Sequence, residues 1–173
     1  MDSITLILGG ARSGKSRYGE EMALGSRLKP AYIATAEAWD DEMRERIAAH
    51  QGRRVGRGWL EVEAPLGLAE AIAENAAEDR VLLIDCLTLW LTNLMMAKRD
   101  IDAAASTLLA VLARAPGQSI LISNEVGFGI VPENAMARRF RDLAGRLHQD
   151  IARDANQVLL MVAGLPVVVK DSA

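Results

Sequence analysis

An eight-residue glycine-rich motif near the start of the sequence limits what this chain can fold into more than any other feature. It matches G-x-x-x-x-G-K-[ST] at every fixed position and follows directly on the apolar run 4–8, which predicts a buried strand. Helical spacing begins at Ser16, so the motif lies between a strand and a helix, where its glycines can turn backbone N–H groups around phosphates. We expect Lys15 to neutralise the β and γ phosphates of a nucleotide, and the Ser16 hydroxyl to ligate Mg²⁺. The alternative, a glycine-rich turn without a ligand, is disfavoured by the strand and helix around it. The motif consists of Gly9, Gly10, Ala11, Arg12, Ser13, Gly14, Lys15 and Ser16.

Strand and helix patterns alternate along the rest of the chain. Short apolar runs rich in β-branched residues predict strands, and the segments between them have the spacing of helices. The alternation predicts an α/β fold, a mostly parallel sheet flanked by helices on both faces, with ligands at the carboxyl ends of the strands. The phosphate loop makes this a fold of P-loop NTPase type. We expect strands at 4–8, 31–34, 81–84, 119–122 and 158–162, and helices at 16–24, 41–50, 66–76, 88–96, 102–112 and 134–155. Residues 51–58, with three glycines and three arginines, are expected to form an irregular, mobile linker.

Length and composition narrow the class of protein further. The 173 residues, 50% of them hydrophobic, predict a single domain, 1–173, with an ordinary buried core. One cysteine and two histidines exclude a disulfide framework and a cysteine-based zinc cluster, and they fit a reducing cytoplasm. A net charge of −3 gives no basic surface for nucleic acid, and no apolar stretch is long enough to span a membrane. The N-terminus lacks a signal-peptide pattern, so we expect a cytoplasmic protein without nucleic-acid or membrane partners.

A second acidic group is expected near the metal ion, and Asp85 is the candidate. It ends the apolar run 81–84, as in a Walker B strand, and would lie at the carboxyl edge of the sheet beside the phosphate loop. The alternative is that Asp85 caps the helix that begins near Leu87. No N-K-x-D motif is present, which disfavours a guanine-specific regulatory GTPase.

His50 is the other candidate for chemistry. It ends a segment of helical spacing, with Arg46 one turn before it and Arg53 and Arg54 shortly after it. Neighbouring cations disfavour the imidazolium form, so a neutral imidazole among anion-binding arginines could attack phosphorus as a nucleophile. The alternative, a histidine half-packed on the core beside a solvated basic loop, is the one that the residues alone favour. His148 lies among apolar residues of another helical segment and is expected to be a packing residue.

Several segments of the sequence together resemble one enzyme family. The phosphate loop is common to very many enzymes, but D-D-E-M-x-x-R-I-x-x-H over 40–50 and N-E-V-G-x-G-I-V-P-E over 124–133 are far more specific. Together with 9–17, 32–36 and 92–94, they cover essentially the whole chain. The sequence is similar to the bifunctional adenosylcobinamide kinase and adenosylcobinamide-phosphate guanylyltransferase family of cobalamin biosynthesis.

The resemblance implies a RecA-like P-loop enzyme that forms a homo-oligomer, with a trimer suggested, and catalyses two reactions. In the first, ATP or GTP phosphorylates the aminopropanol hydroxyl of adenosylcobinamide. In the second, GTP donates GMP through a guanylyl-histidine to adenosylcobinamide phosphate, which releases pyrophosphate and gives adenosyl-GDP-cobinamide. The family's guanylylated histidine corresponds to His50, so the resemblance reverses the packing interpretation of this residue. Because the two steps act on different phosphorus atoms of a triphosphate, one phosphate loop can serve both.

By similarity, further nucleotide contacts lie outside the phosphate loop. Some relatives carry Glu in place of Asp85, so its side chain either reads the nucleotide or ligates Mg²⁺. The polar end of the strand at 119–122 is expected to bind the acceptor, and Glu125 is either a base toward its hydroxyl or a cap of the helix that begins near Asn134. The expected nucleotide contacts are Ala34, Thr35, Ala36, Gln51, Gly52, Arg53, Arg54, Glu63 and Asp85, and the expected acceptor contacts are Asn124 and Glu125.

Two other functions are compatible with the phosphate loop. A plain P-loop small-molecule kinase would use His50 only structurally and would never release pyrophosphate from GTP. A RecA-like nucleotide-switched binding module would need a basic or aromatic surface for a polymer. The 20 basic against 23 acidic residues and the 4% aromatic content do not indicate such a surface.

Overall fold

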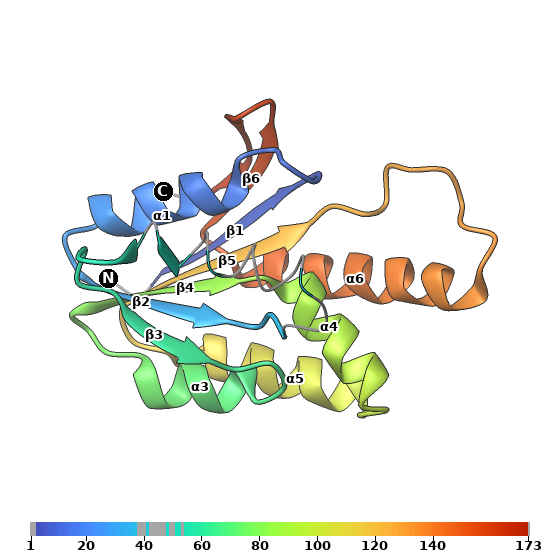
Figure 1. Cartoon of the computed structure of the whole chain (residues 1–173), viewed down its shortest axis with the longest axis horizontal. Helices are drawn as coiled ribbons and strands as arrows, with labels where there is room; N and C mark the ends of the chain where they lie inside the picture. The colour runs from blue at the N-terminus through green and yellow to red at the C-terminus, as the bar shows by residue number, and fades with distance from the viewer. Residues whose placement is uncertain (1–2, 38–40, 42–47, 49–50, 53, 173) are drawn as a thin grey trace.

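The strands form one seven-stranded sheet in the order β3-β2-β4-β5-β1-β6-β7 (Figure 1). The computed structural model describes residues 3–37, 41, 48, 51–52 and 54–172. Every neighbouring pair of strands is parallel except β6 and β7. The mostly parallel α/β sheet predicted from the sequence is therefore confirmed. The strands are β1 (Ser3–Gly9), β2 (Lys29–Ala34), β3 (Leu60–Glu63), β4 (Arg80–Asp85), β5 (Gln118–Asn124), β6 (Gln157–Val162) and β7 (Leu165–Asp171).

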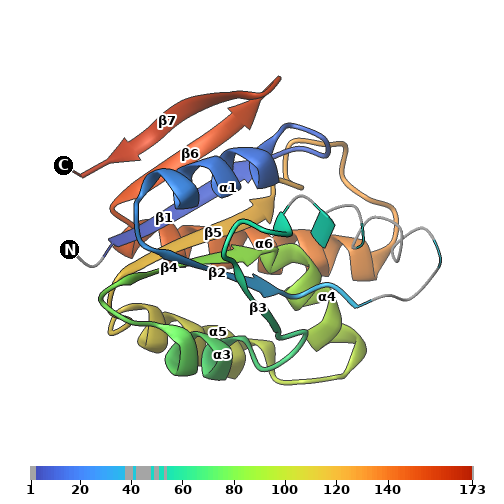
Figure 2. The ribbon, with the colours of Figure 1, turned by 60° about the vertical axis from the view of Figure 1, so that its left-hand side comes forward.

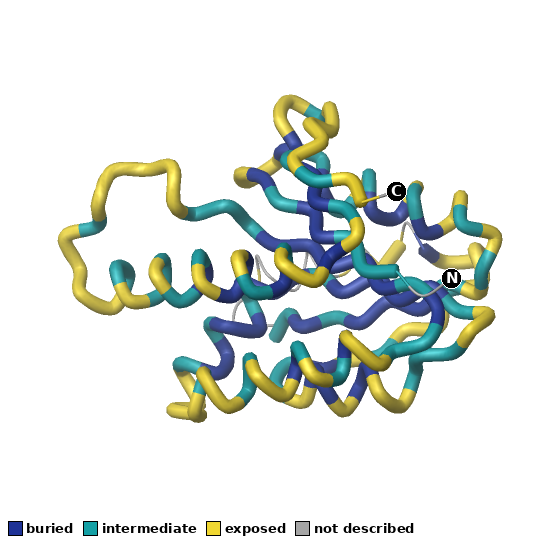
Figure 3. The backbone as a smooth tube through the Cα atoms, turned by 180° about the vertical axis from the view of Figure 1, so that it is seen from behind, coloured by how far each residue is buried: buried dark blue, intermediate teal, exposed yellow. Residues whose placement is uncertain are grey.

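Helices cover both faces of this sheet, as Figure 2 shows. Successive residues of a strand point to opposite faces. Leu6 and Leu82 accordingly pack in one core with α3 to α6, while Ile7 and Leu83 pack in the other with α1. Both faces of the central strands are buried, which is why their sequences are continuous apolar runs (Figure 3). The helices are α1 (Lys15–Gly25), α3 (Leu68–Asn75), α4 (Leu87–Met96), α5 (Ile101–Leu112) and α6 (Ala135–Asp154).

Two edge strands were not expected from the sequence. β3 is short and mostly exposed, and two glutamates interrupt its apolar pattern. β7 follows β6 after a tight turn in which Ala163 and Gly164 have φ angles of +53° and +82°. Positive φ at both turn residues suits a two-residue hairpin. Gly164 and Pro166, which interrupt the apolar pattern in the sequence, therefore mark a hairpin turn and an edge strand, where proline is tolerated.

The segment expected to be an irregular linker is partly helical. Gln51, Gly52 and Arg54 have helical backbone, and only Val55 to Gly58 form a turn. The prediction was wrong at the helical positions because Arg54 is buried and held by ion pairs, so its basic character does not reflect a solvated loop. Of the helix expected over 41–50, the structure describes Asp41 and Ala48, which are helical, and the remaining positions lie outside the described residues.

Candidate active site

Strand register brings the predicted site residues to one edge of the sheet. Gly9 at the end of β1 lies opposite Asn124 at the end of β5. Ala34 at the end of β2 lies between Asp85 on β4 and Glu63 on β3. Because all of these strands are parallel, this edge is where an open α/β sheet binds ligands.

The phosphate loop connects β1 to α1 at this edge. Gly14 has φ of +93°, which favours glycine, and it precedes α1 without a side-chain cap. The first turn of α1 contains no acidic residue. The N-terminal N–H groups of α1 are thus left without a capping side chain, and an anion is the group that fits them.

Lys15 folds back over this loop. Its Nζ donates hydrogen bonds to the carbonyl oxygen of Gly10 at 2.6 Å and to Ser13 Oγ at 3.4 Å. Burial lowers the pKa of Lys15, and the neighbouring Cys86 and Asp85 side chains oppose this shift. The ammonium group therefore stands in a desolvated position at the centre of the loop, where it can attract a phosphate.

The hairpin of β6 and β7 supports the loop from the side. The Gly164 N–H donates a hydrogen bond to the Ser13 carbonyl oxygen at 3.0 Å. A Cβ atom on Gly9 would lie 2.6 Å from Ser13 Oγ and 2.8 Å from the Met161 carbonyl oxygen, so this position requires glycine. Sequence reasoning missed this support, since nothing in the motif signals a partner about 150 residues downstream.

Asp85 accepts a hydrogen bond from the Tyr32 hydroxyl at 3.1 Å. Burial and the Asp85 carboxylate raise the pKa of Tyr32 well above its ordinary value, so the hydroxyl keeps its proton and acts as the donor. The alternative role of Asp85 as a helix cap is wrong, because Cys86 is the N-cap residue of α4. A cis peptide bond joins Asp85 to Cys86. Burial raises the pKa of Cys86 to about 11, so this thiol is not a nucleophile at neutral pH.

Thr35 ties the end of β2 to the end of β4. Its hydroxyl donates to the Cys86 carbonyl oxygen at 2.7 Å and accepts from the Cys86 N–H at 2.8 Å. The Thr35 carbonyl oxygen accepts a hydrogen bond from Asn93 Nδ2 at 2.8 Å. The Thr35 side chain is fully buried, so a contact between residues 34–36 and a nucleotide would have to come from their backbone or from Ala34 and Ala36.

Arg54 is occupied by protein contacts. Its guanidinium pairs with Glu20 on α1 at 3.3 Å and with Glu61 on β3 at 2.9 Å. It also lies over the Tyr32 ring, with Cζ 3.4 Å from the ring centroid. Burial lowers the pKa of Arg54, but its hydrogen bond to Glu61, Tyr32 and the two carboxylates outweigh this, and the net pKa is raised.

Gln51 and Gly52 are exposed. His50 and Arg53 lie outside the described residues.

The predicted acceptor residues begin the connection from β5 to α6. Asn124 Nδ2 donates to Thr88 Oγ1 at 3.0 Å, and Glu125 accepts a hydrogen bond from the Gly127 N–H. Glu125 does not cap α6, because the Asn134 side chain accepts from the first N–H groups of that helix. Figure 1 shows this connection extending away from the sheet, and Phe128 within it is 84% exposed.

His148 is buried on α6, as expected for a packing residue, and it also makes a polar contact. Its Nε2 lies 2.7 Å from the hydroxyl oxygen of Ser123, the residue before Asn124. Burial lowers the pKa of His148 from the ordinary 6.5, and the Glu125 carboxylate partly opposes this shift.

This burial predicts a pH dependence of stability. The unfolded chain binds a proton on His148 at higher pH than the folded chain, so stability is present above about 6.5 and is lost as the pH falls toward the folded pKa. Guanidinium unfolding at about pH 7.5 and about pH 5.5 should therefore show a larger loss of unfolding free energy in the wild type than in His148→Gln. Equal losses in the two proteins would contradict this account.

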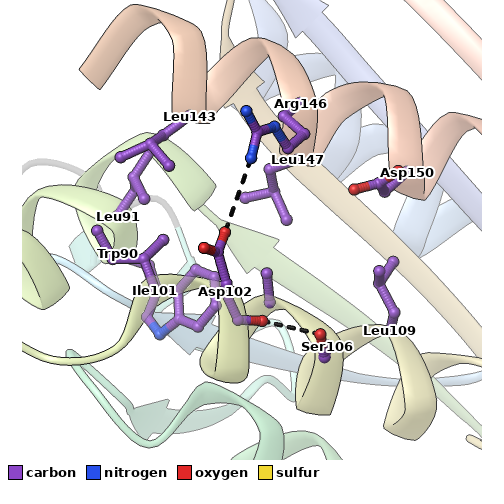
Figure 4. Close-up of a pocket in the computed structure, with 11 residues that line it drawn as sticks. Trp90, Leu91, Ile101, Asp102, Ser106, Leu109, Leu143, Arg146, Leu147 and Asp150 are labelled. Carbon is purple, nitrogen blue, oxygen red and sulfur yellow. Dashed lines mark hydrogen bonds and ion pairs between the residues drawn. The ribbon is translucent and has the colours of Figure 1, made fainter. Parts of the chain in front are cut away.

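A cleft of about 110 Å³ lies between α4, α5 and α6 (Figure 4). Arg146 and Asp102 face each other across it at 3.9 Å, beside apolar side chains such as Leu143 and Trp90. None of the residues predicted for the nucleotide or the acceptor lines this cleft.

The phosphate loop joins the first strand of a mostly parallel sheet to the helix that follows this strand. This arrangement defines a P-loop nucleotide-binding protein of the RecA-like class. One solved structure, of an ATPase domain, matches with a TM-score of 0.57 at 11% identity, over 99% of this chain and 78% of that one. The RadB recombinase matches with a TM-score of 0.50 at 14% identity, over 92% of this chain and 74% of that one. At 11% and 14% sequence identity, these two matches bear on the fold alone, and they confirm the fold class predicted from the sequence.

Residues 5–169 match the family described as cobinamide kinase / cobinamide phosphate guanyltransferase, and the chain belongs to this family of transferases. The bifunctional adenosylcobalamin biosynthesis protein CobP of Pseudomonas aeruginosa is 50% identical over 167 residues, which are 95% of this chain and 96% of that protein. The corresponding CobU proteins of Salmonella typhimurium and Escherichia coli are each 40% identical, over 95% of this chain and 98% of theirs. The resemblance seen in the sequence is confirmed. Among the described residues, no helix is both long and apolar enough to cross a membrane.

Proposed function

We propose that this chain phosphorylates adenosylcobinamide with ATP or GTP and then transfers GMP from GTP to the resulting phosphate. The observation that carries the proposal is the phosphate loop 9–16 with Lys15 buried at its centre, in a chain whose family is named for these two activities. Both reactions would take place in one domain, 1–173.

In the first reaction, the aminopropanol hydroxyl attacks the γ-phosphorus, the bond to the β-γ bridging oxygen breaks, and the nucleoside diphosphate leaves. The hydroxyl proton passes to a base, for which we propose Glu125. Lys15 and the backbone N–H groups at the start of α1 offset the charge that develops on the phosphates. Asn124 and Glu125 would hold the acceptor at the end of β5, next to Gly9.

In the second reaction, we propose that a ring nitrogen of His50 attacks the α-phosphorus of GTP and that pyrophosphate leaves with the bonding electrons. An oxygen of adenosylcobinamide phosphate then attacks the same phosphorus, the phosphorus–nitrogen bond breaks, and the free imidazole is regenerated. The β and γ phosphates can stay in the loop during the attack, since the bond that breaks lies between them and the α-phosphorus. The covalent step divides one difficult displacement into two.

The Ser16 hydroxyl and the Asp85 carboxylate fit Mg²⁺. Both supply hard oxygen ligands, and Asp85 lies close enough to Lys15 to affect its pKa. Among the described residues no group of three His, Cys, Asp or Glu side chains could hold a metal ion. This is compatible with Mg²⁺, which is usually bound by one or two protein groups together with substrate phosphates. When bound, the ion would neutralise phosphate charge.

Further nucleotide contacts are part of the proposal. The end of β2 lies beside Asp85 and the end of β3 lies on the other side of β2, which supports contacts from this edge to the nucleotide. Arg54 is left out because its guanidinium already contacts Glu20, Glu61 and Tyr32. The remaining proposed contacts are Ala34, Thr35, Ala36, Gln51, Gly52, Arg53 and Glu63.

A homo-oligomer, a trimer by the family resemblance, and a cytoplasmic location complete the proposal. Both reactions consume ATP or GTP, which are available in the cytoplasm, and this supports the cytoplasmic location.

The experiment follows each phosphorus separately. Purified protein and adenosylcobinamide are incubated with Mg²⁺ and either ATP labelled at the γ-phosphate or GTP labelled at the α-phosphate. The γ label should appear in adenosylcobinamide phosphate, and the α label should appear in adenosyl-GDP-cobinamide with one pyrophosphate released per turnover. Transfer of the γ label alone, without release of pyrophosphate, would show that the protein is a plain kinase and not the bifunctional enzyme.

A further inference from the structure

Arg54 is a buried cation whose place in the fold calls for an explanation. It is only 4% exposed, although arginine is almost never fully buried unless it is paired. Taking a guanidinium out of water costs several kcal/mol, and its ion pairs offset that cost only with good geometry. Buried ion pairs are therefore weak evidence for a stabilising role, and a positional role has to be considered.

The partners of Arg54 come from three separate elements. Glu20 lies on α1, the helix that starts at the phosphate loop, and its side chain is 9% exposed. Glu61 lies on β3, and Tyr32 lies on β2. The planar guanidinium contacts all three at once, by ion pairs along its edge and by its face on the Tyr32 ring. A lysine ammonium, which is a point charge, could not reproduce this arrangement.

The same contacts lead to the candidate active site. The Tyr32 ring under Arg54 carries the hydroxyl that donates to Asp85, and Asp85 is close to Lys15. Trp59, five residues after Arg54, packs edge-on against the Tyr32 ring with centroids 6.2 Å apart. These contacts place Arg54 beside the candidate active site, next to α1 and next to the Tyr32 ring.

Arg54 also has a defined place along the chain. It lies four residues after His50, and a connection of that length spans at most about 14 Å. Whatever fixes Arg54 on α1 and β3 therefore limits how far His50 can lie from those elements.

We infer that Arg54 is a positioning residue for guanylyl transfer, which anchors the chain just after His50 to the helix of the phosphate loop. The inference rests on the proposed role of His50 as nucleophile. It assigns Arg54 to protein contacts and not to the nucleotide. Guanylylation then depends on Arg54, whereas phosphorylation, which does not use His50, does not.

The test compares the two reactions in Arg54→Lys, with Arg57→Lys as the matched control at a nearby exposed arginine. In Arg54→Lys we expect the rate of labelling by α-labelled GTP at saturation to fall at least about 10-fold, with the KM for GTP within about 3-fold of wild type. Phosphorylation by γ-labelled ATP should stay within about 3-fold, and Arg57→Lys should match wild type in both.

A second variant guards against loss of folding. Glu61→Gln removes one carboxylate charge from a partly exposed partner of Arg54 and keeps a hydrogen-bond acceptor. It should lower labelling by about 3-fold or more, again without a matching loss of phosphorylation, while circular dichroism shows a folded protein.

Three results would overturn the inference. Equal losses of labelling and phosphorylation would mean that Arg54 only stabilises the fold. A raised KM for GTP with an unchanged maximal rate would mean that it binds the nucleotide. Normal labelling in Arg54→Lys and Glu61→Gln would mean that it positions nothing. Failure of the proposed function can be told apart from these three results, because the wild type itself would then take up no label. In that case the positioning role would also be disproved.

Discussion

His50→Ala should take up no label from GTP labelled at the α-phosphate, and its guanylyl transfer should be at least about 1,000-fold slower than wild type. The reason is that alanine removes the atom that we propose attacks the α-phosphorus, so the covalent route is closed. Phosphorylation by γ-labelled ATP should stay within about 3-fold of wild type, because the proposed route of that reaction does not use His50. The measurement is label that stays on the protein after denaturation and is lost in acid but stable in base.

The two histidines of the chain allow a matched control. His148 contacts Ser123 in the interior and has no part in the proposed chemistry. His148→Gln should therefore retain the label, so that its loss in His50→Ala identifies the labelled residue. Label that persists in His50→Ala would disprove the guanylyl-histidine at this position.

Lys15→Met should slow both reactions together, each by about 100- to 1,000-fold. Both transfers draw charge onto phosphates held by the same loop, and Lys15 is the buried cation at its centre. Methionine keeps most of the length of the side chain and removes a buried charge, so the variant should fold. Initial rates with γ-labelled ATP and α-labelled GTP, measured on one preparation, provide the comparison.

Lys29→Met is the control for Lys15→Met. Lys29 pairs with Asp79 on the surface, where an ion pair contributes little, and both rates should match wild type. If Lys15→Met abolished one reaction and spared the other, the two transfers would have to use separate phosphate sites.

The features that were predicted correctly depend on short stretches of sequence. The phosphate loop is recognisable because its glycines, Lys15 and Ser16 act locally, and the central strands are recognisable because burial on both faces makes them continuously apolar. The assignment of Asp85 to the sheet edge followed from the same reasoning, since parallel strands end at a common edge.

The features that were missed have different causes, and the clearest is a contact between residues far apart in the sequence. Arg54 has the sequence context of a solvated basic loop, and only Glu20 and Glu61, brought in by α1 and β3, make it a buried residue. β7 was missed because an edge strand is exposed and carries little pattern of burial. The helix-cap alternative for Glu125 was wrong for a local reason, because Asn134 itself accepts from the first N–H groups of α6.

The position of β1 between β5 and β6 has a consequence for how the protein folds. The phosphate loop lies within the first sixteen residues, but the strands on either side of β1 begin at Gln118 and Gln157. Contacts between residues so far apart in the chain close large loops and are slow to form. We therefore expect the most recognisable motif of the sequence to acquire its shape late in folding. A fragment that contained β1, the loop and α1 alone would lack the neighbouring strands β5 and β6 beside which the loop is held.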